Sequence, residues 1–207
     1  MELYRRSCTL VALGNEVFRS CGLTALVIQN MAQIDASLSS DVIPPLSDAV
    51  HQCELADCQE ELTDAMLRRA IEEGLIDPTR MLQVGLRGQV YGEEDFDFAR
   101  SKGIECISTE DIFEHGVPWV IERYRRFEGT TCYLTFDIDV VDPAFAPGTG
   151  TPQVGGPTSR EIIALIRGLQ GLHFIGADLV EVSPPYDSAE ITSLLAANLL
   201  FEFLCLM

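Results

Sequence analysis

The chain has 207 residues, 47% of them hydrophobic, and a formal net charge of −18 from 32 acidic and 14 basic residues. So acidic a chain argues against a nucleic-acid partner and would attract a cationic ligand. Its seven cysteines form no C-x-x-C pair, which favours a reducing intracellular compartment, cytoplasmic or mitochondrial, over a disulfide framework. The apolar run at residues 194–207 is too short to span a membrane, so we expect a buried helix there and no membrane partner.

Hydrophobic periodicity predicts strands and helices that alternate along the chain. The predicted strands lie at residues 24–28, 81–85, 104–107, 131–136 and 174–182. The predicted helices lie at residues 8–21, 60–73, 93–102, 108–126 with a break at 116–118, 158–169, and from 187 onward. Such alternation predicts an α/β fold with a three-layer, doubly wound parallel sheet and helices on both faces. No linker divides the chain, so we expect a single domain over residues 1–207.

Local signals support several of these boundaries. Thr158 and Glu161 form the sequence pattern of a capping box at the start of a helix. Apolar residues then recur at positions 162, 165, 166 and 169, which predicts that one face of this helix is buried. Gly74 is placed to end the helix at 60–73.

The most informative stretch is residues 131–156, where an apolar strand ends in a cluster of acids. Asp137, Asp139 and Asp142 follow the strand within six positions, and a loop rich in proline and glycine comes next. In a parallel sheet, ligands bind beyond the carboxyl ends of the strands. Asp137 and Asp139 would point to the same side of an extended backbone, where a hard divalent cation such as Mn²⁺ could relieve their repulsion. For Asp142 we favour an ordinary turn-starting role, because Pro143 follows it.

Two segments carry a family resemblance. The segment D-I-D-V-V-D-P-A-F-A-P-G-T-G-T-P-Q-V-G-G at 137–156 and the segment G-A-D-L-V-E-V-S-P-P-Y-D at 176–187 resemble the ureohydrolases of the arginase and agmatinase family. The P-G-T-G-T-P form is most similar to the agmatinase branch. The resemblance covers residues 60–207, while residues 1–59 diverge and the family's N-terminal strands are lacking.

The resemblance implies a binuclear manganese hydrolase with two Mn²⁺ ions per subunit. Asp137 and Asp139 match two of the family's metal ligands, and Glu181 matches the glutamate that binds the substrate's guanidinium group. The implied reaction hydrolyses a guanidino compound, agmatine above all, to urea and an amine such as putrescine. The implied assembly is a homo-oligomer, a trimer or a hexamer. Asp178 and Asp187 are expected to be capping or supporting groups.

The N-terminal part departs from the family pattern. The family's G-G-D-H motif is absent, and the nearest match to its H-x-D-A-H-x-D motif is Q-I-D-A-S-L-S at 33–39. This segment keeps Asp35 as a metal ligand but places Ser37 and Ser39 where the family has a histidine and an aspartate. Such a site would bind Mn²⁺ weakly. An alternative is therefore a catalytically inactive homologue, or an incomplete chain, that acts as a subunit or scaffold after loss of the metal site.

Overall fold

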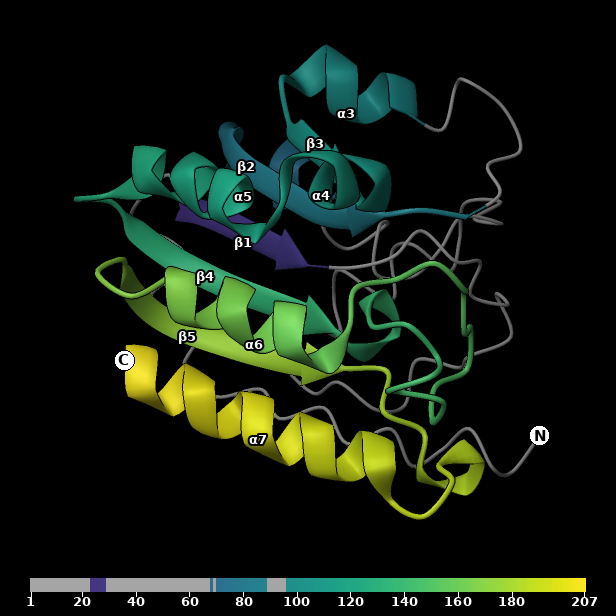
Figure 1. The fold of residues 1–207 in the computed structure, drawn as a ribbon. Helices are drawn as coiled ribbons and strands as arrows, with labels where there is room; N and C mark the ends of the chain where they lie inside the picture. The colour runs from purple at the N-terminus through teal and green to yellow at the C-terminus, as the bar shows by residue number, and fades with distance from the viewer. Residues whose placement is uncertain (1–22, 29–67, 69, 89–95) are drawn as a thin grey trace.

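The computed structural model describes residues 23–28, 68, 70–88 and 96–207, and it has a parallel sheet at its centre (Figure 1). Five strands pair in the order β3-β2-β1-β4-β5, and each neighbouring pair is parallel. The strands are β1 (Leu23–Ile28), β2 (Ile76–Leu86), β3 (Glu105–Ser108), β4 (Thr131–Asp137) and β5 (His173–Val180). The predicted α/β class and parallel sheet are confirmed.

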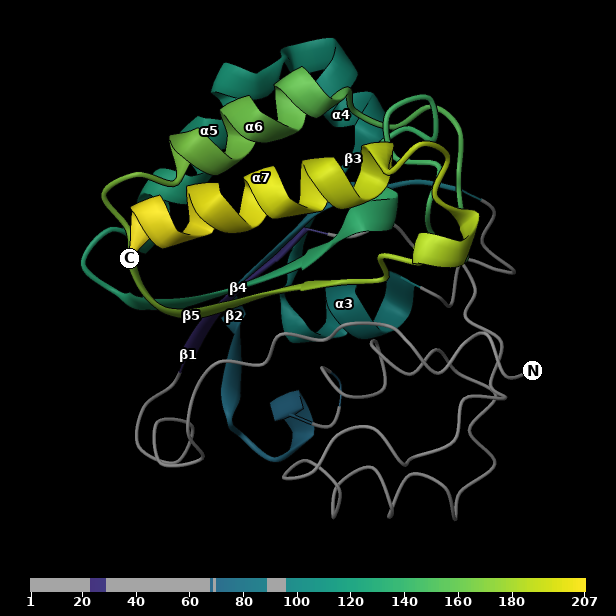
Figure 2. The same cartoon turned by 90° about the horizontal axis from the view of Figure 1, so that it is seen from below.

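Helices cover both faces of this sheet. Four helices, α4 to α7, lie on one face, and α3 lies on the other (Figure 2). The helices are α3 (Asp97–Lys102), α4 (Thr109–His115), α5 (Val117–Tyr124), α6 (Ser159–Gly168) and α7 (Ile191–Leu206), with 3₁₀ turns η4 (Arg125–Phe127), η5 (Ile138–Val140) and η6 (Pro184–Tyr186). Of the helix predicted at 60–73, positions 68 and 70–72 are described and helical, and Gly74 ends it with a φ of 72°. The helix predicted at 8–21 lies outside the described residues.

The strand order creates a switch point between β1 and β4. From β1 the chain moves outward through β2 to the edge strand β3, and it then returns to the other side of β1 as β4. Connections of fixed hand place the intervening helices on opposite faces on the two sides of this point. A crevice forms outside the carboxyl ends of two such strands, and it is the usual ligand site of this architecture. Asp137, the last residue of β4, lies at this position.

The structure contains the helix caps and the helix break that the sequence predicted. Thr158 and Glu161 form a reciprocal capping box at α6, and Ser108 and Asp111 form another at α4. Gly116, with a φ of 81°, separates α4 from α5, as the break at 116–118 predicted. The strand predicted at 174–182 instead ends at Val180, because Glu181 adopts a φ of 65° that no strand residue has.

An apolar core lies between the sheet and helices α5 to α7. Leu134 and Phe136 of β4 are buried there against the predicted apolar face of α6. At Gly168 a Cβ atom would lie 2.3 Å from Cγ1 of Ile121, so a larger residue there would force the Ile121 side chain to move.

α7 differs from the buried helix that the sequence predicted. One side of it packs into the core, but large apolar side chains on the other side are exposed, among them Leu194 at 73% and Phe201 at 63%. Among the described helices, none has both the length and the hydropathy to cross a membrane.

Candidate functional site

Two of the three predicted metal ligands, Asp137 and Asp139, lie together at the carboxyl end of β4. Asp137 is 6% exposed and Asp139 is 2% exposed. They do not share one face of an extended strand, as predicted, because the chain turns into η5 directly after Asp137. The turn brings the backbone N–H of Asp139 to 3.0 Å from Oδ1 of Asp137, which accepts its hydrogen bond. The hydroxyl of Thr151 donates to Oδ2 of Asp139 at 3.1 Å and so orients that carboxylate.

Glu181 extends this acidic cluster from the position directly after the neighbouring strand β5. Its partly buried carboxyl group is close enough to feel the charge of Asp139. Glu181 also has a left-handed backbone with a φ of 65°, which is unfavourable for a residue with a long side chain. Strained backbone of this kind is concentrated at functional sites, where surrounding structure enforces it.

Burial and nearby negative charge raise the pKa values of Asp137 and Glu181. Burial raises the pKa of Asp137 well above its ordinary value, and the charges of Asp139 and Glu181 raise it further. Burial also raises the pKa of Glu181, and the charge of Asp139 adds to this effect. A divalent cation bound between such groups would stabilise their ionised forms and reverse these shifts.

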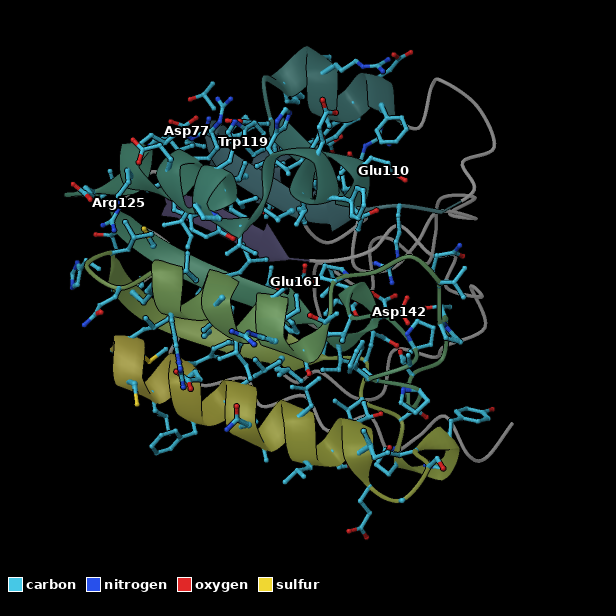
Figure 3. All side chains as sticks on the ribbon, in the orientation of Figure 1. Asp77, Glu110, Trp119, Arg125, Asp142 and Glu161 are labelled. Atoms are coloured by element: carbon cyan, nitrogen blue, oxygen red, sulfur yellow. The ribbon has the colours of Figure 1, made fainter. Side chains whose placement is uncertain are left out.

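The loop after η5 is braced by Asp142, which lies beyond the end of β4 (Figure 3). Its carboxylate accepts hydrogen bonds from the backbone N–H groups of Ala144, Gly155 and Gly156 at 2.8–3.1 Å. Burial by itself would raise the pKa of Asp142, but these N–H groups and the charge of Arg87 hold it below its ordinary value. The turn role predicted for Asp142 is thus confirmed, and it extends to both ends of the loop.

Arg87 is the feature that reasoning from the sequence missed. It follows the last residue of β2, it is 8% exposed, and its guanidinium group donates to backbone carbonyl groups of the loop. Burial lowers the pKa of Arg87, and the charges of Asp139, Asp142 and Glu110 oppose this shift. The sequence signal was an arginine in L-R-G at a strand end, which is common and unspecific by itself.

A second set of contacts joins the loop to the segment between β5 and α7. The N–H of Ser183 donates to the carbonyl of Gly148 at 2.8 Å, and the N–H of Gly148 donates to the hydroxyl of Thr192 at 2.8 Å. Asp187 accepts hydrogen bonds from two N–H groups in the first turn of α7, as its predicted capping role requires. Asp178 instead accepts hydroxyl hydrogen bonds from Tyr133 and Thr135 on the sheet.

The described residues include two of the three predicted metal ligands. Carboxylates such as Asp137 and Asp139 suit a hard divalent cation in charge and in ligand type. Within residues 70–88 and 96–207, however, no three His, Cys, Asp or Glu side chains come together as a ligand group. Asp35 lies outside the described residues, so its predicted role as a ligand stays a prediction. His115 is the last residue of α4, and its ring lies tilted against that of Trp119 with 4.6 Å between the ring centroids.

Comparison with known proteins accords with this geometry. Residues 56–206 match the Arginase family. The chain is 53% identical over 141 residues to a guanidinopropionase of Pseudomonas aeruginosa, which covers 68% of this chain and 44% of the relative. It is 42% identical over 141 residues to the mitochondrial agmatinase of Gallus gallus, covering 68% of this chain and 42% of that relative. The chain therefore spans less than half the length of these relatives.

Solved structures of ureohydrolase-like proteins also align with this chain. Proclavaminate amidino hydrolase from Streptomyces clavuligerus aligns with a TM-score of 0.70 and 35% identity, over 88% of this chain and 55% of that one. A hypothetical agmatinase from Burkholderia thailandensis aligns with a TM-score of 0.61 and 44% identity, over 69% of this chain and 43% of that one. With the family model spanning most of the chain and the acidic strand ends in the expected places, this protein belongs to the arginase family.

Proposed function

We propose that this protein hydrolyses a guanidino compound to urea and an amine with the help of Mn²⁺. The observation that carries the proposal is the buried pair Asp137 and Asp139 at the switch point of the sheet, with Glu181 beside it. Relatives named guanidinopropionase, guanidinobutyrase and agmatinase support the class of substrate.

Each acidic residue has a separate role in this proposal. Asp137 and Asp139 would hold the metal, with Asp35 as a further carboxylate ligand. When bound, the metal supplies activated water and charge stabilisation at the reacting carbon. Glu181 would accept two parallel N–H hydrogen bonds from the planar guanidinium group and so orient it. Thr151 would keep the Asp139 carboxylate turned toward its ligand position.

The substrate's tail is the open part of the proposal, because the relatives' names point to guanidino acids as well as agmatine. We propose agmatine, with putrescine as the amine product, since a chain of net charge −18 favours a cationic tail over a carboxylate. Guanidinobutyrate and guanidinopropionate are the matched competitors, because they carry the same guanidinium group on an acidic tail.

The test is urea release by the purified chain after loading with Mn²⁺. Agmatine, guanidinobutyrate and guanidinopropionate are compared, and Glu181→Gln and Asp139→Asn serve as controls. We expect metal-dependent urea release that Asp139→Asn abolishes, while Glu181→Gln lowers kcat/KM by about 100-fold or more through loss of a charged bidentate contact. If the fully metal-loaded chain releases no urea from any of the three substrates, the proposal is refuted.

A second candidate function is a subunit or scaffold that has lost the metal site. The Q-I-D-A-S-L-S segment at 33–39 favours it, because hydroxyl groups are poor substitutes for charged or imidazole ligands. Metal analysis separates the two: well under two Mn²⁺ per subunit after loading and dialysis supports the scaffold.

We also propose that the chain forms a homo-oligomer inside the cell. The exposed apolar side of α7, including Leu194 and Phe201, supports association, because so many exposed apolar side chains are unusual in a monomer. Light scattering after size-exclusion chromatography would give a trimeric or hexameric mass, and a monodisperse monomer would contradict it.

A further inference from the structure

We propose that Arg87 is a positioning residue that fixes Asp139 and its loop in ligand geometry before any metal binds. Its effect on metal binding rests on the proposed function, whereas its effect on the loop does not. Arg87 lies directly after β2, so it reaches the acidic loop of β4 across the intervening strand β1.

The guanidinium group joins two segments of the loop that are far apart in sequence. Its Nη1 donates to the carbonyl of Val140 at 2.8 Å, and its Nη2 donates to the carbonyl of Asp139 at 2.9 Å. On the other side, Nη2 donates to the carbonyl of Gln153 at 2.6 Å, and Nε donates to that of Val154 at 3.3 Å. One planar group thereby fixes the distance between the start and the end of the loop.

The contact between Arg87 and Asp139 links this arrangement to the predicted metal ligands. Arg87 binds the backbone carbonyl of the same residue whose carboxylate is the predicted ligand. The hydroxyl of Thr151, from the opposite side of the loop, binds that carboxylate. The backbone and the side chain of Asp139 are therefore both fixed by groups that are not ligands themselves, which is how outer contacts tune metal affinity.

Arg87 and Asp142 divide the loop's backbone groups between them. Arg87 donates hydrogen bonds to carbonyl groups of the loop, and Asp142 accepts hydrogen bonds from its N–H groups. The opposite charges of the two side chains attract each other. Gly156 lies where the two meet. A Cβ atom at this position would lie 2.7 Å from Nη2 of Arg87, from the N of Asp142 and from the O of Val140. The absence of a side chain at Gly156 thus allows the loop backbone to lie directly against the guanidinium group.

A lysine cannot reproduce these contacts. Its ammonium group has three donors at one point, whereas the guanidinium group presents five donors in a fixed plane. Arg87→Lys therefore keeps the positive charge but removes the planar set of donors. Arg126→Lys is the matched control, because Arg126 also donates to a backbone carbonyl of β2, that of Met81 at 3.0 Å, and pairs with Glu105 away from the acidic loop.

The experiment measures two quantities in each variant. The first is hydrogen exchange at the N–H groups of Asp142, Gly155 and Gly156, whose hydrogen bonds depend on a closed loop. The second is the Kd for Mn²⁺, from the electron paramagnetic resonance signal of free Mn²⁺. We expect Arg87→Lys to accelerate exchange at these groups and to raise the Kd about 10- to 100-fold. Arg126→Lys should change neither by more than about twofold, even if both variants lower Tm equally.

If the parent binds Mn²⁺, two outcomes in Arg87→Lys would overturn the proposal. One is unchanged exchange in Arg87→Lys, and the other is faster exchange with a Kd equal to that of the parent. If the parent itself binds no Mn²⁺, the proposed function fails, and exchange alone then decides the role of Arg87 in the loop. Faster exchange confined to the loop in Arg87→Lys supports that role, and an equal increase in Arg126→Lys refutes it.

Discussion

Two regions of this protein are ordered by different forces. The layer between the sheet and helices α5 to α7 is an apolar core, with Phe136 and Leu165 fully buried. The loop at 137–156 is held instead by polar contacts to its backbone, from Arg87, Asp142 and Thr192. Apolar packing tolerates many sequences of the right pattern, whereas a polar framework depends on individual atoms. We therefore expect the core to govern stability and the loop to govern binding.

Truncation of the core should have the largest effect. Leu165 is 0% exposed within α6, so Leu165→Ala leaves a cavity as well as losing apolar burial. The expected loss in the free energy of unfolding is about 2–5 kcal/mol, measured by urea denaturation. The folded fraction should bind Mn²⁺ as the parent does. A weakened metal affinity in this variant would show that the two regions are not independent.

The next largest loss of stability is expected from adding a methyl group to the packed loop. The Cβ atom of Gly156→Ala would meet backbone atoms of Asp142 and Val140, which cannot rotate away. We expect a loss of about 1–3 kcal/mol. Gly155→Ala is an instructive neighbour, because its Cβ would meet no atom within 4 Å but its φ of 80° is unfavourable for alanine. A Gly156→Ala protein as stable as its parent would contradict the close packing around Arg87.

Removal of a buried charge should stabilise the loop region. Because the folded-state pKa of Asp137 is raised above its ordinary value of 3.8, the folded protein binds this proton more tightly than the unfolded chain. The free energy of unfolding of the metal-free protein should therefore fall as pH rises from about 4 toward neutral. Asp137→Asn should flatten this dependence and add about 1 kcal/mol at pH 7, a common gain when a functional charge is removed.

Calorimetry of metal-free samples between pH 4 and 7 measures the effect. Asp142→Asn is the contrasting control, because the pKa of Asp142 is lowered and its contribution is lost only as pH falls below about 4. An Asp137→Asn protein with the parent's pH profile would show that Asp137 is not the group responsible.

The smallest effect concerns a polar atom in the apolar region. Tyr124 is fully buried in α5, and its hydroxyl has no hydrogen-bond partner among the described residues. Burial accordingly raises the pKa of Tyr124. Tyr124→Phe should stabilise the protein by about 0.5 kcal/mol, since the small void left behind offsets part of the gain from removing an unsatisfied group. Tm by calorimetry measures it, and a clear loss would reveal a partner for the hydroxyl.

The sequence predicted the core region well because its pattern is periodic. The faces of α6, the capping box at Thr158 and the strand that ends at Asp137 were all accessible from local spacing. The two carboxylates and Glu181 were predicted from motifs, and they do lie at adjacent strand ends.

The parts that could not be predicted depend on contacts between distant residues. Nothing near Arg87 in the sequence indicates that it binds carbonyl groups more than 50 positions away. The turn that takes Asp139 out of the strand depends on a hydrogen bond to a side chain, which periodicity does not detect. The exposed side of α7 was missed because the helix is apolar on all sides, so no pattern distinguishes its two faces.

The left-handed backbone at Glu181 bears on how such a chain changes during evolution. Glycine or asparagine would occupy a φ of 65° with less strain, and one or two base changes in a codon are enough to introduce such residues. A lineage with no use for the carboxylate would gain folding stability from that exchange. Retaining glutamate here gives up about 1 kcal/mol of that stability, so the position is a sensitive marker of whether selection still acts on binding.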